Sequence, residues 1–294
     1  MPPSIARRGR HFCFFLPFPL YFFVRKEEAS LPMGYEGMHS DMIGKRNGTT
    51  ALTTRRAKAK QVCVVLEREL GLPVQSSTLP PPLDVLIATV LSQNTNDKNS
   101  HRAYVGLRSR FPTWEQASVA PTRSIAAVIR TGGMADQKSK RIKEILHRVY
   151  DRLHAYSLDP LRKSSNQEIM DWLTSLPGIG PKTAACVILF ALGRDIFPVD
   201  THVHRVCNRL GITNGARTPE ETFREMADVV PKGKGYSFHT NLIRFGRMIC
   251  RSTRPLCGEC PLYDLCVYTE KTVRTRSTVS RTDHHFMLLD NVRS

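Results

Sequence analysis

The stretch Leu176-Pro177-Gly178-Ile179-Gly180-Pro181-Lys182-Thr183-Ala184 joins two amphipathic segments and decides the fold. Gly178 and Gly180 permit backbone conformations that are closed to other residues and let another backbone approach closely. Pro181 suits the first position of a helix. The loop and the helix N-terminus then present unpaired N–H groups to an anion such as a nucleic-acid phosphate. A helix–helix turn without a ligand is the alternative.

Lys182 is expected in the first turn of that second helix. The positive end of the helix dipole disfavours a cation there, and burial or neighbouring cations would favour the neutral amine further. A neutral lysine amine is a nucleophile that forms Schiff bases with carbonyl-like carbons. The hairpin alone leaves a second interpretation equally open, in which Lys182 only contacts phosphate.

Asp200 follows Lys182 by 18 residues, within the segment PVDTHVH that opens the next helix. Its type and place predict an N-cap. A carboxylate there can also stabilise a developing positive charge or direct proton transfer. His202 and His204 are interpreted as packing or surface residues, one of which contacts phosphate.

Four cysteines fall in the pattern Cys250-x6-Cys257-x2-Cys260-x5-Cys266. Structural zinc sites usually take two Cys-x2-Cys pairs, and only one is present. Four thiolates in one compact loop suit a [4Fe–4S] cluster, and disulfides are the alternative. Arg251 and Arg254 lie between the first two cysteines, where they could reach DNA phosphate and give the cluster a positioning role.

The chain has 294 residues and a formal net charge of +17. Residues 1–56 contribute +5 and residues 271–294 contribute +3, so the middle of the chain keeps +9. This excess indicates a polyanionic partner, with nucleic acid as the first candidate. A basic but unspecialised surface is the alternative.

Eight cysteines in a chain of this length are too few for a disulfide scaffold, which favours a reducing compartment. Cys186 and Cys207 lie in apolar helical patterns and are predicted to be buried. We expect a location in the cytoplasm or nucleoid of a prokaryote, or in the nucleus or an organelle of a eukaryote. No stretch reaches the roughly 18–20 apolar residues that span a bilayer. The Phe-rich run 11–24 resembles a signal peptide, but prolines interrupt it and charged residues follow it.

Hydrophobic periodicity between Gly, Pro and Asn breaks predicts helices only. They are Ala57–Leu70, Leu83–Ser92, Lys98–Arg110, Trp114–Val119, Thr122–Arg130, Gln137–Leu153, Asn166–Leu176, Pro181–Leu192, Thr201–Leu210, Pro219–Val230 and Tyr236–Cys250. No segment alternates as a half-buried strand does. The sequence therefore predicts an all-α fold with a disordered extension over 1–55 and a flexible tail over 271–294.

The hairpin, the VDTHVHRVCNRLG segment and the cysteine spacing, in this order, resemble the endonuclease III family of DNA glycosylases. The resemblance runs from about Ala57 to Glu270. It implies a two-domain helix-hairpin-helix fold with the active cleft between the domains. A six-helix barrel domain would span 79–194, and a [4Fe–4S] domain would combine 56–78 with 195–270.

The same resemblance implies roles for single residues. Lys182 falls at the family's Schiff-base lysine, Asp200 at its catalytic aspartate, and the four cysteines at its cluster ligands. Gln93 matches the glutamine that fills the gap left by a flipped nucleotide, and Met134 falls where a leucine often wedges into the duplex. Ala135 and Gly132 depart from the pattern around that wedge, which leaves the preferred lesion open.

The implied activity is that of a bifunctional DNA N-glycosylase and abasic-site lyase in base excision repair. Its expected partner is double-stranded DNA with an oxidised pyrimidine or an abasic site, bound by a monomer away from any membrane. Thymine/uracil and adenine mismatch branches are rivals. They usually lack the lysine, and the adenine branch has a glutamate where Thr89 stands. A non-catalytic iron–sulfur protein that binds DNA is a further rival.

Overall fold

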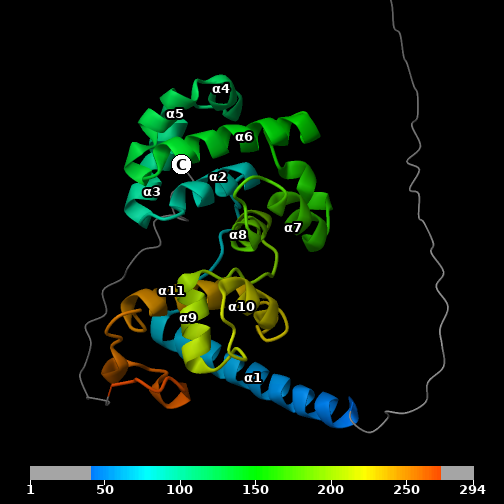
Figure 1. Cartoon of the computed structure of the whole chain (residues 1–294), viewed down its shortest axis with the longest axis vertical. Coiled ribbons are helices and arrows are strands. Elements are labelled where there is room, and N and C mark those ends of the chain that lie inside the picture. Colours follow the sequence, from blue (N-terminus) through cyan, green and yellow to red (C-terminus); the bar gives the residue numbers. More distant parts are fainter. Residues whose placement is uncertain (1–40, 273–294) are drawn as a thin grey trace, which may run out of the picture. The chain divides into compact units, whose positions relative to one another are not determined.

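The computed structural model describes residues 41–272, with side chains from residue 51 onward. The chain divides after Gly44, and the description below concerns the unit that begins at Lys45. Every regular element in the described range is helical, which confirms the predicted all-α fold (Figure 1). None of these helices has the length and apolar character that crossing a bilayer requires.

The α-helices are α1 (Asp41–Leu70), α2 (Pro82–Ser92), α3 (Asp97–Arg110), α4 (Trp114–Val119), α5 (Thr122–Val128), α6 (Ala135–Leu153), α7 (Asn166–Thr174), α8 (Pro181–Leu192), α9 (Thr201–Leu210), α10 (Pro219–Met226) and α11 (Gly235–Met248). Short 3₁₀ turns are η1 (Arg130–Gly132), η2 (Asp159–Lys163), η3 (Cys257–Glu259) and η4 (Tyr263–Leu265).

Helix α1 corrects one boundary, because it begins at Asp41 and not at Ala57. The disorder predicted for residues 41–55 is therefore wrong, while residues 1–40 lie outside the described range. Arg55 donates from Nε to the carbonyl of Ile212 at 2.6 Å, and its Nη2 pairs with Glu225 at 2.8 Å. These partners stand more than 150 residues away, so local sequence could not reveal what anchors this part of the helix.

Local signals set most of the other helix ends. Ser165 and Glu168 form a capping box that starts α7, each side chain accepting the other residue's backbone N–H. Gly193 takes a left-handed conformation, φ 67°, and ends α8. Helix α5 stops at Val128, two residues before its predicted end, because the chain tightens into η1.

The buried apolar side chains form two clusters. The first gathers residues of α2–α8, with Leu86, Ile142 and Ile188 fully inaccessible to solvent. Helices α2 and α8 pack against each other within it (Figure 1). The second joins α1 to α9, α10 and α11, and Leu66 and Leu242 are fully inaccessible there. Their residue ranges follow the two predicted domains, but whether each folds independently stays a prediction.

Candidate active site

The hairpin between α7 and α8 is anchored by apolar side chains and exposed at its glycines. Leu176 and Ile179 are each 4% exposed, so they fix the loop to the first cluster. Gly178 has φ +68°, a conformation that L side chains rarely adopt. Gly178 and Gly180 are exposed, and their N–H groups have no acceptor among the described residues. The loop therefore offers free N–H donors to an anion.

Lys182 and Asp200 line one cavity of about 480 Å³. Lys182 is the second residue of α8, as predicted, and is half-buried. Asp200 caps α9, as predicted, and its Oδ1 accepts the N–H of Val203 at 2.8 Å. The other carboxylate oxygen accepts no hydrogen bond from the described residues. The cavity thus brings together an amine and a carboxylate that are 18 residues apart in the sequence.

His239 and Cys186 also line this cavity, and sequence reasoning did not assign either of them to the site. His239 is 2% exposed, and its Nδ1 donates to the Pro198 carbonyl at 2.8 Å. Burial lowers the pKa of His239 to about 4, Asp200 opposes this shift, and Lys182 adds to it. The ring is therefore neutral near pH 7, with Nε2 as an acceptor.

Cys186 lies one turn after Lys182 on α8 and is 4% exposed. Burial raises the pKa of the Cys186 thiol, and the nearby ammonium of Lys182 opposes that rise. The thiol is thus a small, neutral part of the cavity wall. Cys207, on α9, is fully buried, so the prediction of burial is confirmed for both cysteines.

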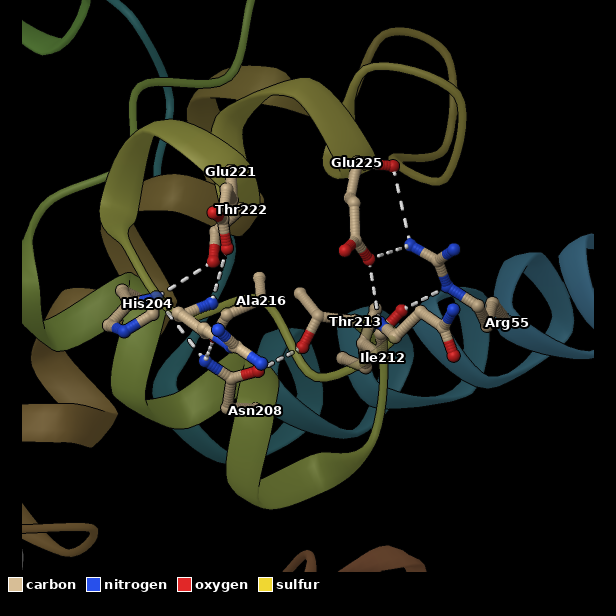
Figure 2. Close-up of polar contacts among 11 residues, drawn as sticks. Arg55, His204, Asn208, Ile212, Thr213, Ala216, Glu221, Thr222 and Glu225 are labelled. Carbon is tan, nitrogen blue, oxygen red and sulfur yellow. Dashed lines mark hydrogen bonds and ion pairs between the residues drawn. The ribbon is translucent and has the colours of Figure 1, made fainter.

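The two histidines after Asp200 have different environments. His202 lines the cavity, where burial lowers its pKa and Asp200 opposes that shift. His204 instead bonds through Nδ1 to the Thr222 hydroxyl at 2.7 Å and to the Asn208 side chain at 3.2 Å (Figure 2). His204 therefore helps to hold α9 against α10, while His202 stays available at the site.

Gln93 and Met134 occupy neighbouring loops, but the Gln93 side chain is hydrogen-bonded within the protein, whereas the Met134 side chain is exposed. Gln93 donates from Nε2 to the Gly178 carbonyl at 3.3 Å and accepts from Arg141 at 2.7 Å. Met134 is 49% exposed, and its sulfur contacts Asn94 Nδ2 at 3.6 Å. Asn94 and Met134 both have left-handed φ values, 54° and 51°. Asn94 is thus the residue beside Met134, and nothing in the sequence marked it.

Lys138 connects the loops that carry these residues. It is 2% exposed, and its Nζ donates to the carbonyls of Leu91 and Gly132, each at 2.8 Å. Burial lowers the pKa of Lys138, and the nearby Arg141 lowers it further. One buried ammonium therefore ties the end of α2 to η1.

Cys250, Cys257, Cys260 and Cys266 line one small cavity, and each is a free, half-buried thiol. Arg209 donates from Nη1 to Cys250 Sγ at 3.6 Å and to the Arg251 carbonyl at 2.6 Å. Within residues 41–272, no group of three or more His, Cys, Asp or Glu side chains is close enough to hold a single metal ion. Thiolates are ligands for both zinc and iron–sulfur clusters, so the chemistry of the four cysteines fits a bound cluster.

Comparisons with known proteins identify the class. The profile of the HhH-GPD superfamily of base excision DNA repair proteins matches residues 87–232. A putative DNA glycosylase of Arabidopsis thaliana is 31% identical over 230 residues, which cover 72% of this chain and 78% of the relative. Endonuclease III of Thermotoga maritima is 35% identical over 187 residues, 64% of this chain and 83% of the relative. The chain belongs to the HhH-GPD superfamily of base excision DNA repair proteins.

Within that superfamily the chain is an endonuclease III-like DNA glycosylase. A solved structure of a trapped covalent intermediate between endonuclease III and DNA is similar to it, with a TM-score of 0.63 and 26% identity. That match covers 72% of this chain and 95% of the solved one. The resemblance drawn from the three motifs is therefore confirmed, for the family and for the fold.

Proposed function

We propose that this chain is a bifunctional enzyme that removes an oxidised pyrimidine from DNA and then cleaves the strand at the abasic site. One observation carries the proposal: Lys182, two residues after the exposed Gly180 of the hairpin, and Asp200 line the same cavity. Pockets of several hundred cubic ångströms suit small ligands, so the cavity can take one flipped nucleotide. The trapped covalent intermediate of the similar endonuclease III supports an attack by the protein on DNA.

The chemistry begins with the neutral amine of Lys182, which attacks C1′ of the flipped nucleotide. The bond between C1′ and the base breaks, and the base leaves with the electron pair and takes up a proton. While it is ionised, Asp200 stabilises the positive charge that develops on the sugar as the base leaves. It then accepts the proton that the lysine nitrogen loses. The C1′–O4′ bond then breaks, O4′ takes up the proton from Asp200, and the nitrogen lone pair forms the Schiff base with C1′. Water takes the C2′ proton, the 3′ phosphate leaves with its bonding electrons, and a second water hydrolyses the Schiff base, which releases the sugar and restores Lys182.

The DNA is positioned by groups around the cavity. The free N–H donors at Gly178 and Gly180 bind a backbone phosphate without reading sequence. His202 lines the cavity and contacts DNA there, and the exposed Arg251 and Arg254 add contacts with backbone phosphates. Met134 wedges into the base stack, where flipping costs a few kcal/mol and least for damaged or mismatched bases.

The gap that the flipped nucleotide leaves needs a polar side chain as well as Met134. Gln93 was predicted for this role, and its side chain is bound to the hairpin and to Arg141. Asn94 contacts Met134 directly. We therefore assign the insertion to Asn94 with Met134, and to Gln93 the support of their loop.

Borohydride trapping tests the lyase chemistry. Duplexes that each carry one modified base are incubated with enzyme and borohydride, and covalent adducts are counted for wild type and Lys182→Ala. We expect adducts for wild type only. Base release without strand cleavage would instead indicate a monofunctional mismatch glycosylase. Binding without any product would indicate a non-catalytic DNA-binding protein. Either result refutes the proposal.

We further propose that the four cysteines hold a [4Fe–4S] cluster. Their lining of one cavity and the Arg209 donor at Cys250 support this assignment. When bound, the group would join Cys250, two residues after α11, to the three later cysteines and so fix the loop that carries Arg251 and Arg254, which gives it a structural role. The chain's own residues carry every step of the reaction above.

Metal analysis tests the cluster separately from catalysis. We expect a brown protein with about four irons and four sulfides per chain, and loss of the colour in Cys260→Ala. A colourless protein with stoichiometric zinc contradicts the assignment. Cys186→Ala, outside the motif, is the matched control and should keep the iron.

A further inference from the structure

We propose that Arg141 binds a DNA backbone phosphate together with the hairpin and, through Gln93, couples that phosphate to the loop that enters the duplex. This inference rests on the DNA-binding mode proposed above. Arg141 then acts as a positioning residue, because it touches neither the cavity nor the reacting sugar.

Arg141 joins three segments that are far apart in the chain. Its Nη1 donates to Gln93 Oε1 at 2.7 Å, and Gln93 Nε2 donates to the Gly178 carbonyl at 3.3 Å. These bonds bridge 48 and 85 residues, so α6, the segment after α2 and the hairpin meet at one guanidinium. A displacement of the hairpin would therefore reach Gln93 directly.

The guanidinium lies against the hairpin backbone. A Cβ atom at Gly178 would stand 2.2 Å from Arg141 Nε and 2.3 Å from Cζ. A side chain at position 178 would therefore force the Arg141 head to move, in addition to adopting the φ of +68° that favours glycine. The positive charge of Arg141 is thus held beside the exposed N–H donors of the loop.

The guanidinium keeps donors for a ligand. Of its five N–H groups, one bonds to Gln93, and the described residues give Arg141 no carboxylate partner. Arginine forks match phosphate oxygens, and the free N–H groups of the hairpin, which lies against Arg141, favour the same kind of ligand. The buried Lys138, one turn earlier on α6, increases the local positive potential. A phosphate diester satisfies all of these groups at once.

The first test measures the salt dependence of binding to a duplex that contains an uncleavable abasic analogue. Arg141→Met should weaken binding about tenfold at low salt and lower the slope of log K against log salt by about 1, the value for one phosphate contact. Arg148→Met is the control, because it removes one exposed charge from the same helix. An unchanged slope in Arg141→Met, with a folded protein by circular dichroism, overturns the phosphate contact.

The second test measures the coupling to Gln93. We compare Arg141→Met, Gln93→Ala and the double variant by the fluorescence of 2-aminopurine placed opposite the abasic analogue, which reports on entry into the duplex. The two losses should be non-additive, and Arg141→Lys should restore the salt slope without restoring the coupling. Additive losses overturn the positioning role.

These outcomes are distinct from a failure of the proposed catalysis. The analogue cannot be cleaved, so binding and insertion are measured without lyase chemistry. If the enzyme binds DNA with these salt slopes but gives no borohydride adduct, the role of Arg141 is supported and the proposed lyase activity is refuted.

Discussion

At the scale of single residues, the neutral state of His239 decides which hydrogen bonds the cavity can offer. The Pro198 carbonyl can only accept, so Nδ1 carries the proton and Nε2 is left as an acceptor. The rings of Phe190 and Phe197 pack around the imidazole, 5.7 and 6.2 Å away between centroids, and exclude water. The cavity therefore contains a neutral nitrogen base, His239, in addition to Lys182.

Protonation of His239 should make folding stability depend on pH. Its pKa is about 4 in the folded protein and 6.5 when exposed, so the unfolded chain takes up the proton first. This contribution to stability is present above pH 6.5, falls as the pH decreases towards 4, and levels off below 4, with a slope of at most about 1.4 kcal/mol per pH unit. Urea unfolding of wild type and His239→Gln from pH 4 to 7 measures it. Parallel curves would show that His239 does not titrate differently on folding.

Gly178 should be required for two separable reasons. Alanine at a left-handed φ costs about 1 kcal/mol, and its Cβ must also displace the Arg141 head. We expect Gly178→Ala to destabilise wild type by about 2 kcal/mol, and by only about 1 kcal/mol when Arg141 is already methionine. Urea unfolding of the four proteins gives both penalties. Equal penalties would mean that the guanidinium moves aside without cost.

At the scale of elements, the sequence predicts a helix well where residues at the ends of that helix determine where it begins and stops. The cap at Asp200, the capping box at Ser165 and the break at Gly193 are local, so ten of the eleven α-helices in the described range could be predicted with small errors at their ends. The contacts of His239 and Arg141 depend on how the helices pack, and no short-range pattern encodes them. The N-terminal half of α1 was not predicted either, because the partners of Arg55, Ile212 and Glu225, are also distant in the sequence.

Asp200 has one role in an element and one in the site, because it caps α9 and also lines the cavity. Asp200→Asn keeps an acceptor for the Val203 N–H and removes the charge. We expect this variant to keep its stability within about 0.5 kcal/mol and to lose most of its base-removal activity. Asp200→Ala should lose the activity and also about 1 kcal/mol of stability. Single-turnover assays and urea unfolding on the same preparations separate the two roles, and full activity in Asp200→Asn would contradict the catalytic one.

At the scale of the whole molecule, both clusters contribute to the active site. Lys182 comes from α8 of the first cluster, whereas Asp200 and His239 come from α9 and α11 of the second. Helix α8 contacts α10 and α11 directly. The alignment of the amine with the carboxylate therefore depends on contacts between the clusters as well as on the packing within each.

These shared contacts predict that the two clusters unfold together. Both tryptophans, Trp114 and Trp172, pack in or against the first cluster, so their fluorescence reports on that cluster alone. Leu242→Ala opens a cavity in the second cluster, at a side chain with no solvent exposure, and should cost about 2–5 kcal/mol. If the clusters are cooperative, this change must lower the midpoint of the tryptophan transition as much as that of the circular dichroism transition.

The matched variant is Leu86→Ala, which opens a comparable cavity in the first cluster. Coincident transitions in both variants indicate one cooperative unit. If Leu242→Ala leaves the midpoint of the tryptophan transition unchanged, the two clusters are instead independent domains. The geometry of Lys182 and Asp200 would then depend only on the contacts of α8 with α10 and α11, without support from cooperative folding of the two clusters.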